Sequence, residues 1–254
     1  AFSYRHRRTA SCRTPSSSIG YNTDTMASEP SVRLNKHLAL QLGFSRREAD
    51  EMIAKGQVSI NGGTATLGAR INPTDTIRVN GKELTHAATY QYVAFHKPVG
   101  YVCSRKAQGD TPTIYSLLPA QYHALKPVGR LDKDSSGILL LTNDGDFAFS
   151  MTHPSFHKTK VYHVTLDTPL EPLHQQMVSD YGVDLPDGKS QLNLMCLNDD
   201  RTQWEVTMGE GRNRQIRRTF AALGYNVIVL HRIQFGSYAL GSMKSGGYEP
   251  TDIR

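Results

Sequence analysis

The pattern of apolar residues near the start of the chain predicts two short helices followed by short strands. Leucines recur at every fourth position over residues 34–42, and Gly43 can end a helix there. Ser45 and Glu48 then have the spacing of a capping box, and an apolar face follows over residues 49–53. The next β-prone runs, VSINGG and IRVNGK, each contain Asn-Gly, a strong turn signal. We therefore expect a small helix–helix–strand domain over residues 31–84.

The remainder of the chain, residues 92–254, is dominated by strand patterns. The run GILLLT is apolar throughout, as in a strand buried on both faces, and KVYHVTL alternates. Because strands follow one another without regular helix alternation, we predict an α+β fold with a mostly antiparallel mixed sheet. A polar linker, residues 85–91, precedes this domain. Strands are expected at 92–97, 100–104, 137–142, 160–166, 191–197, 202–208 and 226–235, and helices at 171–181 and 213–224.

Residues 1–30 differ in composition from both predicted domains. They are rich in Arg and Ser, contain no acid before Asp24, and lack the apolar core of a secretory signal. We expect this stretch to be disordered and to lie outside the fold. It fits either translated upstream sequence, which we favour and which implies a cytoplasmic protein, or an organellar transit peptide within residues 1–25.

Composition narrows the classes of protein that fit. No apolar run approaches the length of a membrane span, and the three cysteines form no CxxC pair. These features exclude a transmembrane helix and favour a reducing, intracellular setting. The formal net charge of +6 favours a polyanionic partner. Five cations lie on or beside the two predicted helices, and as a cluster they favour phosphate contact: Arg33, Lys36, Arg46, Arg47 and Lys55.

One acid stands out because of its surroundings. Asp132 follows an Arg-Leu pair in VGRLDKDSSGILLLTNDGD and precedes the apolar run 137–142. An acid before a strand is usually a turn or cap residue, and we interpret Asp134, Asp144 and Asp146 in that way. The sequence contains no P-loop, no dinucleotide-binding glycine motif, no zinc-protease motif and no nucleophile elbow. We therefore expect no metal, no nucleotide and no other cofactor, so that any chemistry uses ordinary side chains.

The segment EGRNRQIRR places four arginines on or beside the predicted helix 213–224. On such a helix Arg214 and Arg218 point nearly opposite to the apolar face, towards solvent or RNA. Arg217 falls on the flank, where a half-buried guanidinium can bind a carboxylate with two hydrogen bonds and keep it ionised. We hypothesise that Arg217 pairs with Asp132.

Two resemblances join these observations. RLNKHLALQLGFSRREADEMIAKGQVSING resembles the alpha-L RNA-binding motif, first recognised in a small-subunit ribosomal protein, which implies a module that binds structured RNA. GRLDKDSSGILLLTNDGD, KVYHV and EGRNRQIRR resemble three motifs of the pseudouridine synthases, and their order resembles the RsuA/RluB branch of that family. The resemblance covers nearly all of residues 32–254. It implies an enzyme that isomerises uridine to pseudouridine in ribosomal RNA without metal, redox partner or energy source.

The resemblance also implies roles for individual residues. Asp132 would be the catalytic carboxylate, Tyr162 would stack on the target uracil, and Arg217 would orient Asp132. Whether Asp132 attacks the sugar, attacks the base or removes a proton stays open. For Lys160 the alternative to an RNA contact is a charge at a strand edge. For Arg212, Arg214 and Arg218 the alternative is a solvated helix face. The implied RNA contacts in this domain are Arg130, Lys160, Arg212, Arg214 and Arg218.

Several functions compete with this one. The stretches 123–166 and 230–250 most resemble the small-subunit enzymes of the family, which favours 16S rRNA over large-subunit rRNA as the substrate. A non-catalytic ribosome-assembly factor would have no need of Asp132, Tyr162 and Arg217 together. A glycoside-processing enzyme would need two essential acids and no RNA module. We expect a monomer that acts on ribosomal RNA or a pre-ribosomal particle.

Overall fold

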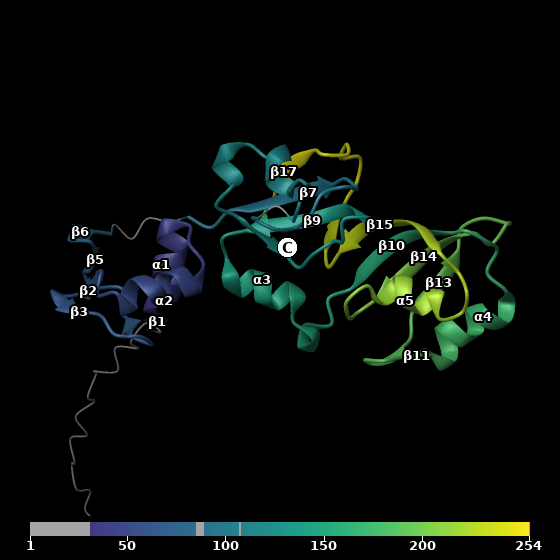
Figure 1. Ribbon diagram of the computed structural model, residues 1–254, viewed down its shortest axis with the longest axis horizontal. Helices are drawn as coiled ribbons and strands as arrows, with labels where there is room; N and C mark the ends of the chain where they lie inside the picture. Colours follow the sequence, from purple (N-terminus) through teal and green to yellow (C-terminus); the bar gives the residue numbers. More distant parts are fainter. Residues whose placement is uncertain (1–30, 85–88, 107, 254) are drawn as a thin grey trace, which may run out of the picture.

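Two bodies, each with its own hydrophobic core, make up the protein, whose computed structural model describes residues 31–84, 89–106 and 108–253. The smaller core lies among residues 34–79, and the larger body has two clusters among residues 93–240. Figure 1 shows the small body beside one end of the larger one, which gives an elongated molecule. The predicted extension, residues 1–30, lies outside the described residues.

The small body contains the two predicted helices, α1 (Leu34–Leu42) and α2 (Arg46–Ala54). Gly43 ends α1 in the left-handed conformation, and Ser45 and Glu48 form the predicted capping box. Both Asn-Gly pairs adopt positive φ, as a tight hairpin turn requires. One sheet pairs β1 (Val32–Arg33) with β4 (Arg70–Ile71), and the other has the order β3 (Gly63–Thr64), β2 (Val58–Ile60), β5 (Ile77–Val79), β6 (Lys82–Glu83).

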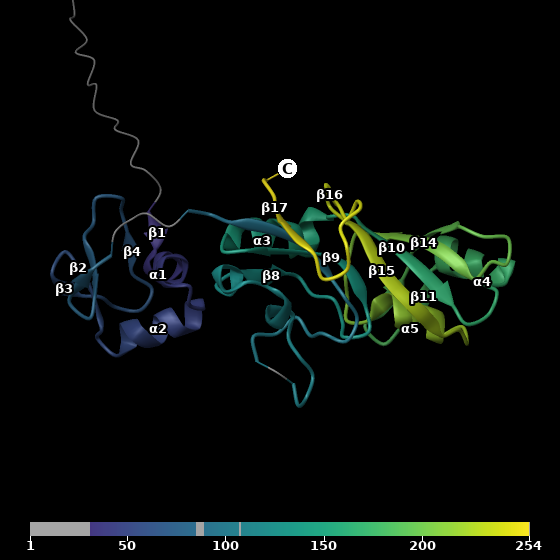
Figure 2. The ribbon, with the colours of Figure 1, turned by 90° about the horizontal axis from the view of Figure 1, so that it is seen from above.

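The larger body is built on a nine-stranded sheet in which β15 and β9 are parallel and the other described pairs are antiparallel. This confirms the predicted α+β fold with a mostly antiparallel mixed sheet, and Figure 2 shows its twist. The strand order is β13 (Asn193–Cys196), β14 (Gln203–Met208), β10 (Lys160–Leu166), β15 (Val227–Phe235), β9 (Ser136–Thr142), β7 (Tyr92–Lys97), β17 (Tyr248–Pro250), with β16 (Tyr238–Ala239) beside β15 and β8 (Lys126–Val128) beside β9.

Helices pack on both faces of this sheet. Ile138 and Leu140 of β9 pack with α3, whereas Leu139 and Leu141 join the cluster that contains Ile216 and Phe220 of α5. The strand β9 is therefore buried on both faces, as its unbroken apolar run predicts. The helical elements are α3 (Gly145–Thr152), α4 (Pro172–Gln176), α5 (Gln215–Ala221), the 3-10 turns η1 (Ile114–Leu117), η2 (Ala120–Tyr122) and η3 (Pro154–Phe156), and the π-helical η4 (Met177–Tyr181); a hairpin joins β11 (Val183–Leu185) to β12 (Gly188–Ser190).

Some local predictions are wrong or incomplete. The expected strand 100–104 is irregular, because Gly100 turns the chain with φ 91° and its N–H bonds to the carbonyl of Lys133 in a loop. The expected helix 171–181 divides into α4 and η4. The sequence pattern did not predict α3, although Asp144 confirms its structural interpretation by capping this helix at the N–H groups of residues 146 and 147.

Candidate active site

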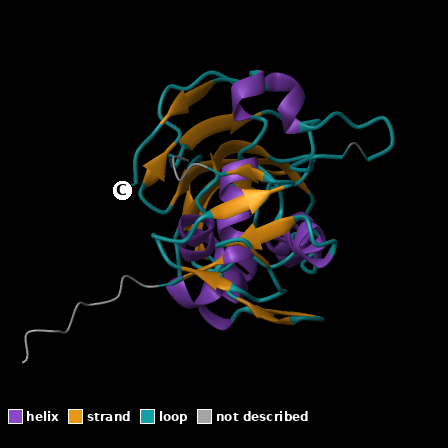
Figure 3. Cartoon of the chain, turned by 90° about the vertical axis from the view of Figure 1, so that its left-hand side faces the viewer, coloured by secondary structure: helices purple, strands orange, loops and turns teal. Residues whose placement is uncertain are grey.

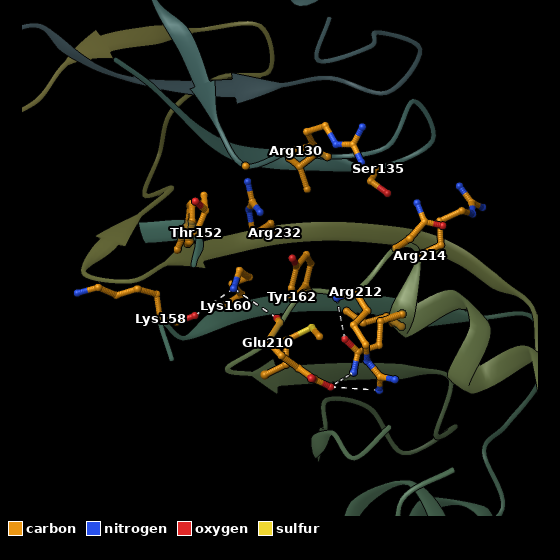
Figure 4. A pocket seen from close by; sticks show the side chains of 18 of the residues that line it. Arg130, Ser135, Thr152, Lys158, Lys160, Tyr162, Glu210, Arg212, Arg214 and Arg232 are labelled. Atoms are coloured by element: carbon orange, nitrogen blue, oxygen red, sulfur yellow. Dashed lines mark hydrogen bonds and ion pairs between the residues drawn. The ribbon is translucent and has the colours of Figure 1, made fainter. Parts of the chain in front are cut away.

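A pocket of about 410 Å³ opens in the larger body between the loop 129–132, the strands β10 and β15, and the start of α5. Figure 4 shows Tyr162 near its centre, with Arg232 and Arg130 above it. Tyr162 and Arg232 are direct partners across β10 and β15, and only 7% and 2% of their surfaces are exposed. The pocket thus combines a buried aromatic ring with a buried cation.

Asp132 lines the same pocket, although it lies 30 residues before Tyr162 in the sequence. Its side chain is 36% exposed, so the carboxylate meets both the pocket and solvent. The structure therefore brings together the predicted catalytic acid and the predicted stacking ring. Of the other predicted residues, Arg130, Lys160, Arg212 and Arg214 line the pocket.

The loop that carries Asp132 is fixed from below by Lys97, the last residue of β7. Lys97 is fully buried, and its Nζ donates to the carbonyls of Pro98 (2.9 Å), Asp132 (2.9 Å) and Ser135 (2.7 Å). Burial lowers the pKa of Lys97, although the nearby Cys103 and Asp132 oppose this effect. Because this ammonium binds backbone oxygens of the loop, the Asp132 carboxylate is left to face the pocket.

A glycine joins the Asp132 loop to the strand that carries Arg232. Gly137 pairs with Arg232 where β9 and β15 run parallel, and its φ is 113°. A Cβ at this position would lie 2.1 Å from the Arg232 carbonyl oxygen, a distance that no side chain could occupy. Only glycine therefore permits this close approach of the two backbones.

Two arginines at the start of α5, the loop-side pair Arg214 and Arg217, contact the loop that carries Asp132. Arg214 donates to both carboxylate oxygens of Asp134 (3.1 and 3.0 Å) and approaches Asp132 Oδ2 at 3.5 Å. Arg217 Nε lies 3.3 Å from Asp134 Oδ2, and its Nη groups donate to the carbonyls of Asp134 and Val227. The predicted pairing of Arg217 with Asp132 is therefore wrong. The first acid after Asp132 on this loop, Asp134, binds Arg217.

The electrostatics of Asp134 follow from these contacts. Burial alone would raise its pKa, but the hydrogen bonds from Arg214 and the charge of Arg217 outweigh burial and lower it. Arg217 is only 12% exposed, and burial lowers the pKa of its guanidinium, a change that Asp134 and Asp132 oppose. Asp134 thus remains ionised and ties α5 to the loop that presents Asp132.

The other two arginines of the segment, the hairpin-side pair Arg212 and Arg218, bind the tip of the β11–β12 hairpin. Arg218 forms two hydrogen bonds with the Asp187 carboxylate at 2.9 and 2.7 Å. Arg212 contacts the same carboxylate and donates to the carbonyls of residues 187, 188 and 189. The helical pattern predicts that Arg218 points towards solvent or RNA; its guanidinium is partly exposed and binds the hairpin.

Arg232 is the functional candidate that the sequence analysis missed. Its Nε donates to the Ile138 carbonyl at 2.8 Å and its guanidinium lies 4.8 Å from the centre of the Phe235 ring. Its Nη2 is buried and has no hydrogen-bond partner among the described residues. An unsatisfied buried donor beside a pocket points to a ligand oxygen that would accept from it. The signal in the sequence is a lone arginine within the apolar run VIVLHRIQF.

Lys160 adds a second cation to the pocket. Its Nζ donates weakly to the carbonyls of Lys158 and Glu210, at 3.2 and 3.3 Å. Burial lowers the pKa of Lys160, the charge of Arg232 lowers it further, and Glu210 opposes both. The pocket thus combines several cations with two acids, Asp132 and Glu210, and the ring of Tyr162, an arrangement suited to a negatively charged, planar substrate.

The described residues give no sign of metal chemistry or of a membrane span. No group of three or more His, Cys, Asp and Glu among them could hold a metal ion. No helix in the described ranges is long and apolar enough to cross a membrane.

Comparison with known proteins identifies the family. The family model described as RNA pseudouridylate synthase matches residues 91–222, and the S4 domain model matches residues 32–77. The chain belongs to the RNA pseudouridylate synthase family. The small body is therefore its S4 domain, and the pocket of Asp132 lies in its synthase domain.

Individual members of the family match almost the whole chain. Ribosomal small subunit pseudouridine synthase A of Pasteurella multocida is 36% identical over 85% of this chain and 94% of its own length. Ribosomal large subunit pseudouridine synthase B of Bacillus subtilis is 34% identical over 84% and 89% of the two chains. A crystal structure described as a pseudouridylate synthase superposes with a TM-score of 0.62 at 36% identity, and covers 87% of this chain and 96% of that one.

Within the S4 domain of this synthase, the predicted RNA contacts differ in their surroundings. Arg33 precedes α1, Arg47 lies in the first turn of α2, and Lys55 ends α2. All three are exposed, and none of their side chains forms a hydrogen bond or ion pair with another described residue. Lys36 differs, since its ammonium pairs with Asp146 of the synthase domain.

Proposed function

We propose that this protein is an rRNA pseudouridine synthase in which Asp132 is the catalytic carboxylate. The observation that carries the proposal is the assembly of Asp132, Tyr162 and Arg232 on one pocket from three separate segments. Neither a binding-only protein nor an assembly factor needs an acid held at a pocket by a buried lysine. Membership of the synthase family supports the same conclusion.

The reaction breaks the N1–C1′ bond of uridine, turns the uracil, and forms a C5–C1′ bond. No atom is gained or lost, so side chains alone suffice. The uridine must leave its stack to reach Asp132, so we propose base flipping into the pocket. Tyr162 would then stack on the uracil, and the free Nη2 of Arg232 would donate to one of its oxygens.

The remaining cations would act on the RNA and on the loop. Arg130 is exposed at the pocket and would contact the backbone beside the extruded uridine, with Lys160 on the opposite side. Arg217 would orient Asp132 indirectly, through Asp134 and the loop. Arg33, Arg47 and Lys55 would contribute phosphate contacts from the S4 domain, which add affinity without sequence choice.

We further propose small-subunit rRNA, free or in a pre-ribosomal particle, as the substrate, in the cytoplasm and with the enzyme acting as a monomer without a cofactor. Relatives from Pasteurella multocida, Yersinia pestis and Haemophilus influenzae that bear the small-subunit name support this choice. A large-subunit relative is nearly as similar, so large-subunit rRNA is the second candidate. Mapping pseudouridines in both rRNAs from cells that lack this protein distinguishes the two. We also propose domain boundaries at residues 31–84 and 92–254, with residues 85–91 as the linker.

The test of the mechanism is Asp132→Asn. The variant keeps the size of the side chain but removes the charge, so we expect pseudouridine formation to fall by at least about a thousandfold. RNA affinity should remain, because the phosphate contacts are untouched. Both are measured with rRNA transcripts, by chemical mapping of pseudouridine and by filter binding.

The matched control is Asp199→Asn, an exposed acid in a turn away from the pocket. It should leave both measurements at the wild-type level. Normal turnover by Asp132→Asn would contradict the proposed catalytic role.

A further inference from the structure

Three cations from three separate segments lie together where the two bodies meet. Arg46 begins α2 in the S4 domain, Arg105 lies in the loop after β7, and Lys126 begins β8. We call Arg46, Arg105 and Lys126 the junction cluster. Burial is the main reason why the pKa of Lys126 is lowered, and the charges of Arg105 and Arg46 lower it further, whereas the charge of Glu48 opposes them. The three like charges are therefore close enough to repel one another.

The cations are held at the junction by backbone atoms and not by acids. Lys126 Nζ donates across the junction to the carbonyl of Phe44 at 2.6 Å, and Arg105 Nη2 donates to the carbonyl of Ala124 at 2.7 Å. The guanidinium of Arg46 approaches the synthase domain closely, since a Cβ on Gly145 would lie 3.1 Å from its Nη2. Backbone carbonyls fix Lys126 and Arg105 without neutralising their charge, and no ion pair joins these cations to an acid among the described residues.

The nearby acids already have partners. Glu48 accepts the N–H of Ser45 at 2.6 Å in the capping box, and these hydrogen bonds lower its pKa most, followed by the charges of Arg105 and Lys126. Asp146 pairs with Lys36, and Asp144 caps α3 and accepts the Tyr92 hydroxyl. A cleft of about 320 Å³ at the junction is lined by Lys36, Arg46 and Lys126 together with Asp144. Positive charge therefore exceeds negative charge there.

The junction also lies on the same side of the molecule as α5 (Figure 2), whose first residues line the pocket of Asp132. Figure 2 shows α2, the loop around residues 103–112 and α5 along one side. Figure 3, seen from the end of the S4 domain, shows the same loop projecting from the body. An RNA that contacts both α2 and the start of α5 would therefore pass the junction cluster.

We propose that the junction cluster binds a backbone phosphate of the RNA substrate. Two guanidinium groups and an ammonium that converge without a carboxylate of their own provide the donors and the charge that a phosphodiester needs. This inference rests on the proposed function in that the anion is the rRNA. It assigns a contact that neither the S4 domain nor the synthase domain could make alone.

The test uses the full-length double variant Arg46→Ala/Arg105→Ala and an in vitro transcript of small-subunit rRNA. Affinity is measured by filter binding between about 50 and 200 mM salt. Each lost phosphate contact should reduce the slope of log affinity against log salt by about one unit. Because the three cations share one phosphate, we expect a reduction of about one unit and weaker binding at low salt. The control is Lys82→Ala, an exposed cation of β6 on the outer sheet, which should keep the wild-type slope.

A single variant, Arg105→Glu, strengthens the test, because a repelling charge should weaken binding more than alanine does. Both arginines are exposed, and the thermal midpoint of unfolding checks that each variant folds. A wild-type slope in both variants overturns the proposal. If the variants reduce the salt slope but the wild-type enzyme makes no pseudouridine, the result supports the junction site and contradicts the proposed function. If the wild-type enzyme makes pseudouridine but the variants keep its salt slope, the result contradicts only the junction site.

Discussion

The loop-side pair and the hairpin-side pair of arginines come from one short segment but hold different parts of the protein. The loop-side pair, Arg214 and Arg217, binds Asp134 on the loop that presents the proposed catalytic acid, Asp132. The hairpin-side pair, Arg212 and Arg218, binds Asp187 at the tip of a hairpin. Neighbouring residues of one type thus divide their roles according to the position of the acids in the fold.

The two pairs differ mainly in the part of the protein that each one positions, and less in the number of contacts that they make. The guanidinium of Arg217 is mostly buried and bridges the Asp134 carbonyl to the Val227 carbonyl, so it joins the loop to β15. The side chain of Arg218 is 31% exposed, against 12% for Arg217, and exposed ion pairs contribute little to stability. Loss of a loop-side contact should therefore slow the reaction, whereas loss of a hairpin-side contact should change only the local structure of the hairpin.

The largest effect is expected from Lys97→Met, which removes the other support of the loop. Methionine retains the apolar length of the side chain but leaves three buried carbonyls without their donor. We expect the free energy of unfolding to fall by about 3 kcal/mol, together with a loss of turnover. Urea denaturation measures the first and pseudouridine formation the second.

Lys189→Met on the hairpin provides the comparison for this variant. Lys189 is exposed, so its replacement should change stability by less than about 0.5 kcal/mol. Equal urea midpoints for the two variants would contradict the role assigned to Lys97.

A matched pair of substitutions, Arg217→Gln and Arg218→Gln, separates the two sides directly. Arg217→Gln should loosen the loop that presents Asp132, and we expect kcat with saturating RNA to fall by roughly tenfold to a hundredfold, the scale of a small misplacement of a reacting group. Arg218→Gln should reduce kcat far less but speed amide hydrogen exchange in residues 183–190. Equal losses of kcat in both variants would show that the arginines act as one charged surface.

Local patterns in the sequence predicted local structure well. The capping box of α2, the Asn-Gly turns and the doubly buried strand β9 all depend on residues close in sequence, and all are confirmed. The meeting of Asp132 and Tyr162 on one pocket was predictable only through the family resemblance, because spacing carries no information about contacts 30 residues apart. Two buried cations, Arg232 and Lys97, were not predicted as site residues.

The failed prediction for Arg217 and the two residues that were not predicted all concern contacts between segments far apart in the sequence. The helical pattern shows which way an arginine side chain points. It does not show which acid of a distant loop lies beside that side chain, so Asp134 was not predicted as the partner of Arg217. Arg232 was missed because an isolated arginine in a strand usually lies at a surface, whereas here the pocket replaces solvent. Lys97 binds carbonyl oxygens, and no side-chain motif reports such partners.

The smallest expected effect is the pH dependence of the Asp134 contacts. The arginines hold the folded-state pKa of Asp134 below its ordinary value of 3.8, so the contacts stabilise the folded state fully above that pH. The stabilisation is lost as the pH falls through the lower, folded-state pKa. At neutral pH Asp134→Asn should cost less than about 1 kcal/mol, because the carboxylate is half-exposed. The difference in unfolding free energy between wild type and variant should shrink as the pH drops below 3.8.

Asp187→Asn is the matching variant on the hairpin side, and the same pH series for it compares the two pairs of arginines. The pKa of Asp187 is also lowered, chiefly by hydrogen bonds from Arg218, so its stability difference should close in the same direction. At neutral pH, however, of these two variants Asp134→Asn alone should lower kcat, because Asp134 lies on the loop of Asp132 whereas Asp187 lies on the hairpin. If Asp134→Asn kept full turnover while losing the pH-dependent stability, the contacts with the loop-side pair would stabilise the fold without positioning Asp132.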